Sequence, residues 1–237
     1  MSRRPPTPGA RGDRTLSLKR AAKLARKKHR EAERLFLAEG ETLVSEAPEP
    51  PRHLFAADDD VRRLSTLTTP TGPVGVFPFL DVAPDDLLLT CERIVALHGV
   101  QDPGNVGTII RAARAFGAGV ALSRGCADLY NPKTVRATVG SIFHASIARE
   151  IETVSFLEEA GTADFTTAAA MPEEGILPVS LPDGKLVLVV GAEGAGLPDE
   201  VVRACDVAVT IPSRAASLNA AVAASILLYE AYLRVLP

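Results

Sequence analysis

The chain contains, at residues 186–198, the stretch LVLVVGAEGAGLP, in which an apolar run leads into a loop with three glycines. Five apolar residues without polar alternation are typical of a strand that is covered on both faces of a parallel sheet. Glycine allows positive backbone dihedral angles and a close approach of a ligand to the backbone. Glu193 is the carboxylate of this loop, and no cationic residue lies beside it. The stretch therefore predicts a buried strand that ends in a ligand-binding loop.

A second pair of strand and loop follows, where the apolar run at 207–211 leads into PSRAASLN, residues 212–219. This loop places the hydroxyl of Ser217 and the amide of Asn219 at the start of a long apolar helix. Ligands of parallel α/β sheets bind beyond the carboxyl ends of the strands. The two loops are therefore expected to share one site.

The segment from residue 93 onward alternates between short apolar runs and helix-forming stretches, which predicts an α/β fold with a parallel sheet. Strands are expected at 94–97, 119–122, 145–147, 164–168, 186–190 and 207–211. Helices are expected at 105–116, 132–138, 153–160, 198–204 and 217–234.

A smaller unit precedes this sheet. It has a helix-to-strand passage at 32–40, helices from 41 and at 58–64, and strands at 53–56 and 74–79. A proline-rich segment, as at the N-terminus of this chain, is typical of disorder. We therefore expect a disordered arm at residues 1–14, a small N-terminal α/β domain at 15–89 and a C-terminal domain at 90–237.

The composition excludes several classes of protein. The 237 residues are 46% hydrophobic, with 18 glycines and 18 prolines, as in a loop-rich α/β protein. Three widely spaced cysteines, without a histidine pair nearby, argue against a disulfide framework and a zinc site, so no metal is expected. The longest apolar stretch, 217–229, is too short to cross a bilayer. A cytoplasmic protein without a membrane role is predicted.

The net charge of −3 conceals a strongly uneven distribution. Residues 1–34 hold twelve Lys or Arg and three Asp or Glu, whereas the remainder holds fourteen basic and twenty-six acidic residues. Clustered positive charge binds polyanions by releasing counterions, and it also occurs in solvated tails. The cationic segment predicts contacts with nucleic acid phosphates, through Lys27, Lys28, Arg30 and Arg34.

A third loop of interest opens the helix at 105–116. Asn105 is placed to cap this helix, which is the ordinary role of an asparagine at such a position. Arg111 and Arg114 lie further along the same helix, one turn apart. Taken alone, such arginines are usually solvated surface residues.

Three ordered motifs resemble those of the SpoU (TrmH-type) RNA ribose 2′-O-methyltransferases of the SPOUT class. They are DPGNVGTIIRAARAFGA at 102–118, GAEGAGLP at 191–198, and IP at 211–212 with SLN at 217–219. Two further stretches resemble the family, LYNPKTVRATVG at 129–140 and RLFLAEGETLV at 34–44. The similarity extends over about residues 15–236.

The resemblance implies a C-terminal SPOUT domain with a deep trefoil knot, an N-terminal RNA-binding domain, a homodimer and S-adenosylmethionine as cofactor. It places Asn105, Arg111, Glu193, Ser217 and Asn219 at catalytic positions. The cofactor positions it implies are Gly191, Glu193, Gly194, Ile211, Leu218 and Asn219. Arg114, Lys133 and Arg136 are further candidates for contacts with RNA phosphate.

Transfer of a methyl group to a ribose 2′-oxygen requires the oxygen, the methyl carbon and the sulfur to be held in line. The family's arginine is usually described as the base, but a guanidinium stays protonated at neutral pH. A role for Arg111 in binding the target phosphate and stabilising alkoxide charge is the chemically simpler alternative. Glu193 is expected to order the cofactor loop or Asn105.

Two functions are compatible with these features, and a third is a remote alternative. The first is a 2′-O-methyltransferase of 23S ribosomal RNA, with antibiotic self-resistance as a compatible role, or of tRNA. The second is an RNA-binding protein on the same scaffold without methyl transfer. It is favoured by residues 213–216, because the interval that they form between Pro212 and Ser217 is shorter than is usual in the family that the motifs resemble. The third, a dinucleotide-dependent dehydrogenase, is disfavoured because the glycines of 191–196 have the wrong spacing for G-x-G-x-x-G.

Overall fold

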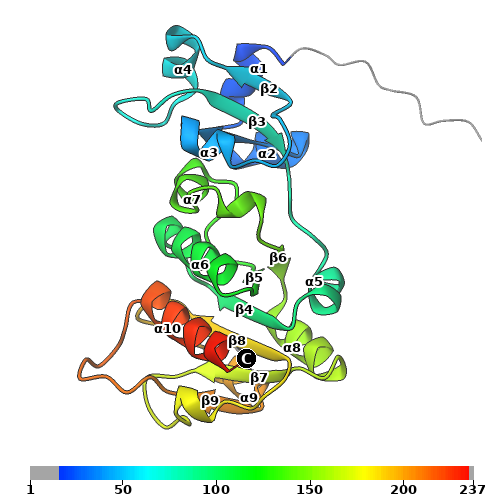
Figure 1. The fold of residues 1–237 in the computed structure, drawn as a ribbon, viewed down its shortest axis with the longest axis vertical. Helices are drawn as coiled ribbons and strands as arrows, with labels where there is room; N and C mark the ends of the chain where they lie inside the picture. Colours follow the sequence, from blue (N-terminus) through cyan, green and yellow to red (C-terminus); the bar gives the residue numbers. More distant parts are fainter. Residues whose placement is uncertain (1–15, 235–237) are drawn as a thin grey trace, which may run out of the picture.

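The structure, a computed structural model, describes residues 16–234, and the predicted disordered arm at 1–14 lies outside them. Figure 1 shows an elongated molecule in which a small N-terminal domain stands above a larger C-terminal domain. Among the described residues, no helix is both long and apolar enough to cross a membrane.

The N-terminal domain is built on a three-stranded antiparallel sheet in the order β1-β3-β2. Side chains alternate along β1, so that Leu35 and Leu37 join a small core with α1 and α4, whereas Phe36 and Ala38 join the core of the C-terminal domain. The elements are α1 (Leu18–Lys23), α2 (Lys27–Glu33), β1 (Leu35–Glu39), α3 (Glu41–Ser45), β2 (His53–Phe55), α4 (Asp58–Leu64) and β3 (Val74–Pro78).

The C-terminal domain is an α/β fold whose six strands are all parallel, in the order β6-β5-β4-β8-β7-β9. The parallel sheet predicted from the sequence is thereby confirmed. The strands are β4 (Arg93–His98), β5 (Gly119–Ser123), β6 (Ile147–Ile151), β7 (Thr166–Ala170), β8 (Leu186–Gly191) and β9 (Val207–Val209). The helices are α5 (Pro84–Thr90), α6 (Pro103–Ala115), α7 (Pro132–Ala137), α8 (Thr153–Thr162), α9 (Asp199–Arg203) and α10 (Ala220–Leu233), with short 3₁₀ turns η1 (Ser141–Phe143) and η2 (Pro178–Ser180).

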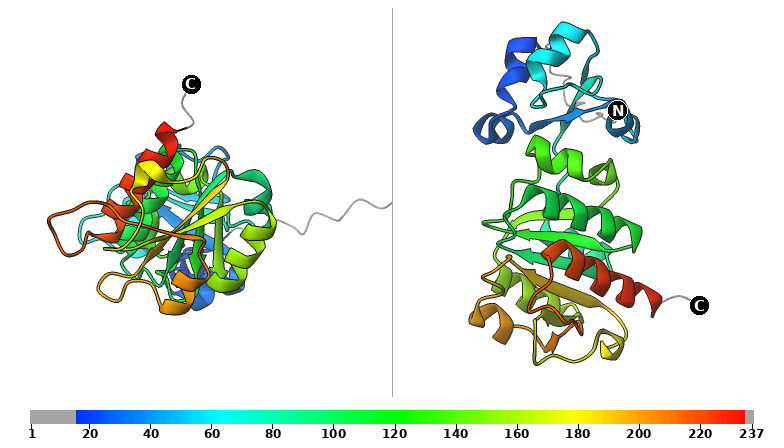
Figure 2. Two further views of the ribbon diagram at one scale, coloured as in Figure 1. Left: turned by 90° about the horizontal axis from the view of Figure 1, so that it is seen from below. Right: turned by 90° about the vertical axis from the view of Figure 1, so that its left-hand side faces the viewer.

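Helices cover both faces of this sheet, as Figure 2 shows. On β4, Val95 and Leu97 pack with α6, α7 and α10, while Ile94 and Ala96 pack with α5, α8 and α9. Because both faces are buried, each strand is apolar throughout, and this explains the uninterrupted run in β8.

Several elements differ from the prediction. Strand β6 begins at Ile147, later than the expected start at 145, and α10 begins at Ala220 because Asn219 caps it, so Ser217 and Leu218 belong to the preceding loop. Helix α5 was not expected. Its Leu87 and Leu88 pack on the C-terminal sheet, so residues 84–89 belong with the C-terminal domain and not with the N-terminal domain to which the sequence pattern assigned them.

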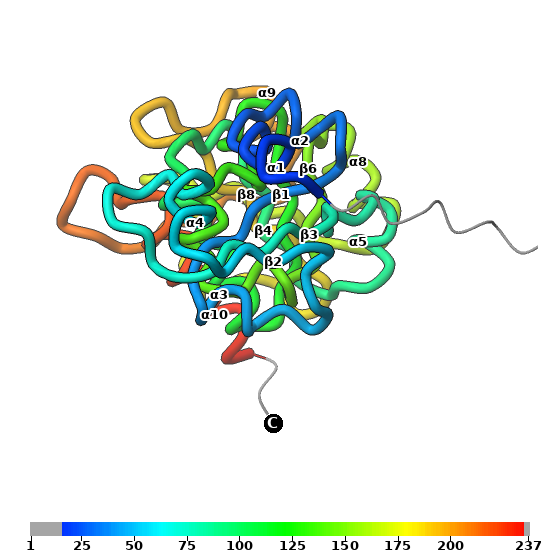
Figure 3. The backbone as a smooth tube through the Cα atoms, turned by 90° about the horizontal axis from the view of Figure 1, so that it is seen from above, coloured from blue at the N-terminus to red at the C-terminus, as the bar shows by residue number. Residues whose placement is uncertain are grey.

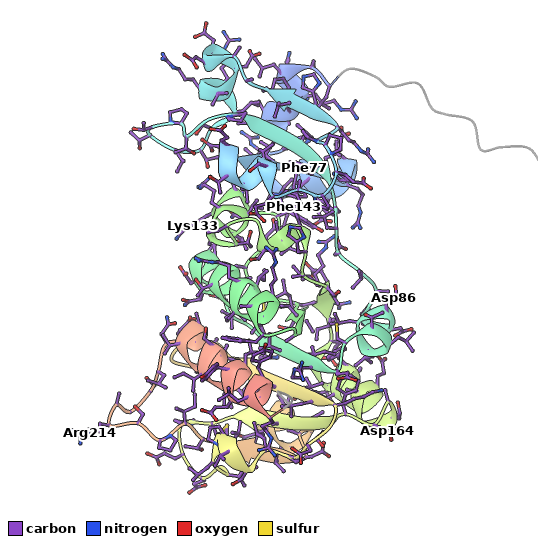
Figure 4. The ribbon with its side chains drawn as sticks, viewed as in Figure 1. Phe77, Asp86, Lys133, Phe143, Asp164 and Arg214 are labelled. Atoms are coloured by element: carbon purple, nitrogen blue, oxygen red, sulfur yellow. The ribbon has the colours of Figure 1, made fainter. Side chains whose placement is uncertain are left out.

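The two domains share apolar contacts, and Figure 3 shows the N-terminal domain stacked over the C-terminal sheet along the long axis. The rings of Phe77 and Phe143 meet between the domains, with their centroids 4.8 Å apart (Figure 4). Phe36 similarly contacts Tyr130, at 4.9 Å between centroids. The apolar core of the C-terminal domain therefore continues into the N-terminal sheet.

Candidate active site

The three loops singled out in the sequence meet at the carboxyl edge of the parallel sheet. The first precedes α6, the second follows β8, and the third, residues 210–219, connects β9 to α10. The third loop extends away from the body, with Arg214 near its tip and Lys133 projecting from the same side of the molecule (Figure 4).

A chain of side-chain hydrogen bonds joins these loops. Asn219 Nδ2 donates to Asn105 Oδ1 at 3.1 Å, and Asn105 Nδ2 donates to a carboxylate oxygen of Glu193. The direction of the chain is fixed at its far end, because Asn219 Oδ1 accepts from the backbone N–H groups of Ala221 and Val222 and so caps α10. The amide of Asn219 can then only donate outward, and Asn105 must in turn donate to Glu193.

The expected capping role of Asn105 is wrong. Asp102 is the N-cap of α6, and its carboxylate accepts from the backbone N–H of Asn105 at 2.9 Å, with Pro103 at the first helical position. Proline is suited to this position because its missing N–H would have no partner in the helix. Since the cap is supplied by Asp102, the side chain of Asn105 is left to connect Asn219 and Glu193.

A cavity of about 600 Å³ lies between the second and third loops, a size that suits a small-molecule ligand or cofactor. Its wall is a mixture of backbone, small side chains and apolar groups from the ends of β7, β8 and β9 and from the start of α10. Every expected cofactor residue lines it, namely Gly191, Glu193, Gly194, Ile211, Leu218 and Asn219, together with Ser217. Asn105 and Arg111 are not among the lining residues.

Gly191 shows why the second loop is rich in glycine. A Cβ atom at this position would lie 2.4 Å from both the carbonyl carbon and the oxygen of Gly196. The loop turns back tightly on the end of β8, with Gly194 and Gly196 at positive φ of 81° and 68°. A larger residue at 191 would push the loop away from the strand that positions Glu193.

Arg111 lies on the exposed side of α6, six residues beyond Asn105. It forms no ion pair with any carboxylate of residues 16–234. Its guanidinium is therefore available to an external anion on the same helix that carries Asn105.

Most of the basic residues expected to contact RNA are paired with carboxylates. Arg30 is the clearest departure from expectation, since its side chain is 3% exposed and paired with Asp128, so it bridges the two domains and is not presented to a ligand. Lys28 is exposed and has no ion-pair partner among the described residues. The remaining pairs are Lys27–Glu150 at 3.2 Å, Arg34–Asp81 at 3.3 Å, Arg114–Glu46 at 3.6 Å, Arg136–Glu39 at 3.6 Å and Lys133–Asp102 at 3.7 Å.

Sequence reasoning missed Met171 and Pro172, which line the cavity directly after β7. The sequence could have indicated them, because every loop that follows a strand of a parallel sheet lies at the carboxyl edge of that sheet. It also missed Asp102 as a cap. Over residues 16–234 there is no cluster of three His, Cys, Asp or Glu side chains that could hold a metal ion.

Comparison with known proteins agrees with this geometry. Residues 92–229 match the model of the SpoU rRNA Methylase family. The chain is 32% identical, over 88% of its own length and 92% of the other's, to the 23S rRNA (guanosine(2553)-2′-O)-methyltransferase RlmP of Bacillus subtilis.

Two solved structures resemble the fold over almost its whole length. An AdoMet-bound rRNA methyltransferase from Sinorhizobium meliloti superposes with a TM-score of 0.85 at 32% identity, over 93% of this chain and 95% of that one. The SpoU methyltransferase AviRb from Streptomyces viridochromogenes, in complex with AdoMet, has a TM-score of 0.81 at 26% identity, over 92% and 97% of the two chains.

Proposed function

The chain belongs to the SpoU rRNA methylase family, and on this premise we propose that the RNA it methylates is 23S ribosomal RNA. The protein is an RNA ribose 2′-O-methyltransferase that uses S-adenosylmethionine. The observation that supports its site most strongly is the hydrogen-bonded chain Asn219–Asn105–Glu193, which connects helix α6 to both loops of the cavity.

The residues around the cavity suit S-adenosylmethionine. Val190, Ile211 and Leu218 offer apolar surface to an adenine ring, and the glycine loop offers backbone groups to the ribose and to the amino acid portion. When bound there, the cofactor supplies a sulfonium methyl group that is already electrophilic. The tasks of the protein are then to orient the two reactants and to manage one proton.

We assign Arg111 to the RNA and not to the cofactor. It is exposed, carries no internal ion pair among the described residues and lies outside the cavity lining. A guanidinium binds phosphate through paired N–H groups and stabilises negative charge that develops on a nearby oxygen. In this role Arg111 holds the phosphate of the target nucleotide and stabilises negative charge on the 2′-oxygen while the hydroxyl proton passes to water.

Asn105 and Ser217 are assigned to orientation of the target nucleotide, and Asn219 to fixing Asn105. Glu193 is assigned to order the cofactor loop, because its carboxylate accepts the Asn105 amide. This arrangement couples the two ligands. A shift of the glycine loop around the cofactor is transmitted through Asn105 to the helix that carries Arg111.

The N-terminal domain is assigned to recognition of structured RNA beyond the target nucleotide. Exposed Lys28 on α2, with Lys19 and Lys23 on α1 and Arg26 between the two helices, offers positive charge. The ion-paired Lys27, Arg34, Arg114, Lys133 and Arg136 would exchange carboxylate for phosphate. Such binding weakens steeply as the salt concentration rises.

A homodimer, a trefoil knot and a cytoplasmic location complete the proposal. Helix α10 leaves Val222, Tyr229 and Leu233 between 41% and 48% exposed, which is a surface that a second copy would cover. The close packing of loops 191–197 and 211–219 around one cavity is compatible with a knotted arrangement. The three cysteines are unpaired, as expected in a reducing compartment.

Mapping ribose methylation in ribosomes and tRNA from cells with and without the gene tests the substrate. We expect loss of one 2′-O-methyl group in 23S rRNA, whereas loss in tRNA alone would overturn the ribosomal assignment. The same strains, compared for growth on ribosome-directed antibiotics, test a role in resistance.

The role of Arg111 is tested in vitro. Arg111→Ala should leave the calorimetric affinity for S-adenosylmethionine nearly unchanged and abolish methyl transfer to 23S rRNA. Unchanged turnover would discard the assignment. Calorimetry on the unaltered protein also tests whether the short interval at 213–216 still allows the cofactor to bind.

A further inference from the structure

The connection between the two domains, residues 79–83, is held by backbone hydrogen bonds at both of its ends. The backbone N–H of Phe79 donates to the carbonyl of Arg34 at 3.0 Å, which holds its start against β1. The backbone N–H of Val82 donates to the carbonyl of Ile147 at 2.9 Å, and Val82 pairs in parallel with Ala148 at the edge of the sheet. The connection therefore continues the sheet and does not behave as a flexible tether.

Between these two anchors the chain is held by Tyr130, whose side chain is fully buried. The Tyr130 hydroxyl accepts from the backbone N–H groups of Leu80 at 2.6 Å and Asp81 at 2.8 Å, and it donates to Asp81 Oδ1 at 2.7 Å. One hydroxyl thus uses its donor and both acceptor positions on two consecutive residues of the connection. Burial raises the pKa of Tyr130, so this hydroxyl keeps its proton.

Charged and aromatic groups also hold residues 79–81 of the connection. Burial alone would raise the pKa of Asp81, but the hydrogen bond from Tyr130 and the charges of Arg149 and Arg34 outweigh it, and the pKa lies below its usual value. The ring of Phe79 stacks on Tyr130 with centroids 3.8 Å apart. The guanidinium carbons of Arg34 and Arg149 lie 4.6 and 4.9 Å from the Phe79 centroid.

The segment that carries Tyr130 also reaches the active site. Just before it, Asp128 pairs with Arg30 of the N-terminal domain, and just after it, Asn131 caps α7. At the second residue of α7, Lys133 lies 3.7 Å from Asp102, which caps the helix of Asn105 and Arg111. A single loop therefore contacts the N-terminal domain, the connection and the helix that carries the catalytic candidates.

We propose that Tyr130 is a positioning residue that holds the N-terminal domain at one fixed place relative to the active site, so that a structured RNA bound by that domain presents one ribose to the cofactor. The proposal rests on the proposed function, since it requires RNA as the ligand of both domains. An RNA too short to reach the N-terminal domain gains nothing from this positioning. A longer RNA binds productively only in the fraction of molecules whose domains have the correct arrangement.

Two RNAs test this, a hairpin that carries only the target nucleotide and its loop, and a longer fragment that adds the flanking helices. Tyr130→Phe keeps the ring but leaves the backbone N–H groups of Leu80 and Asp81 without their acceptor. The ratio of kcat/KM for the long RNA to kcat/KM for the hairpin should fall about tenfold in Tyr130→Phe, and Asp81→Asn should change it in the same direction. Thr90→Val, which removes an exposed hydroxyl at the end of α5, should leave the ratio unchanged.

A separate measurement reports on the domains without any RNA. Spin labels at Leu54→Cys and Leu89→Cys, both exposed and on different domains, are placed in a protein whose native cysteines are alanine. We expect a narrow distance distribution with Tyr130 and a broader one with Tyr130→Phe. Circular dichroism and calorimetry with S-adenosylmethionine establish that each variant folds and binds the cofactor.

An unchanged ratio or an unchanged distance distribution would overturn the positioning role, as would equal loss on both RNAs, which indicates a general defect. If the unaltered protein methylates neither RNA, the proposed function fails, and the spin-label distances still decide whether Tyr130 fixes the domains.

Discussion

The contact between Asn105 and Glu193 leads to a charge-exchange experiment. In Asn105→Asp the donor that faces Glu193 is replaced by a second carboxylate. The lost hydrogen bond to a charged acceptor costs about 1.5 kcal/mol, at the low end because the pair is exposed, and repulsion at the surface adds about 1 kcal/mol. A total of about 2.5 kcal/mol corresponds to a loss of affinity for S-adenosylmethionine of roughly 70-fold.

Glu193→Gln is the matched single change. A glutamine oxygen can still accept from the Asn105 amide, so only the charge is lost, and affinity should fall about threefold. In the double variant Asn105→Asp with Glu193→Gln, the donor and the acceptor exchange places. The carboxylate introduced at position 105 then accepts from the amide introduced at position 193 and from Asn219, so affinity should return to within about fivefold of the unaltered protein.

Isothermal titration calorimetry with S-adenosylmethionine measures all four proteins of this cycle. A double variant at least as weak as Asn105→Asp alone would refute the reasoning, because the two side chains would then act on the cofactor independently. An unchanged affinity of Asn105→Asp for S-adenosylmethionine would show that the contact between residues 105 and 193 does not order the cofactor loop.

Three further results are expected. Gly191→Ala should destabilise the protein by about 1–3 kcal/mol in thermal denaturation, because its Cβ has no room against Gly196, and should abolish cofactor binding; an unchanged melting temperature would contradict this. Burial and the charge of Asp206 raise the pKa of Cys205 to about 12, so iodoacetamide at pH 8 should modify this thiol only after unfolding, as peptide mass spectrometry can measure. Asp81 has a folded-state pKa below its unfolded value, so its stabilising effect, present at neutral pH, should be lost as the pH falls through the folded-state pKa, and Asp81→Asn should flatten that acid-side decline in denaturant titrations.

The arrangement of the parallel sheet could be predicted because burial on both faces leaves a direct trace in the sequence, as in the run that forms β8. Helix α5 was not predicted because its first residues are compatible with two interpretations. A proline followed by acidic residues, as at Pro84, Asp85 and Asp86, is typical of a break between domains, yet proline at the first position and acidic residues in the first turn also favour the start of a helix. The two interpretations differ only in whether apolar residues follow, and Leu87 and Leu88 do.

For the candidate site, the sequence could predict that three loops meet, but not how their side chains are connected. The loops could be placed at one edge of the sheet by topology, whereas the bond from Asn219 to Asn105 depends on the orientation of an amide that only the cap of α10 fixes. The burial of Arg30 could not be predicted from the sequence either. Within a cationic stretch it is indistinguishable from its exposed neighbours, and its burial arises from Asp128, a residue far away in the chain.

The order of the strands has a consequence for how the protein acquires its shape. Strand β4 lies at the centre of the sheet, yet one of its two neighbours is β8, which is synthesised much later. Until β8 arrives, one edge of the apolar strand β4 has unpaired backbone N–H and C=O groups that are open to solvent and to other chains, and pairing over so long a loop is slow. Refolding from denaturant should therefore be slow and prone to aggregation, and binding of the methyl donor should be the last signal to recover.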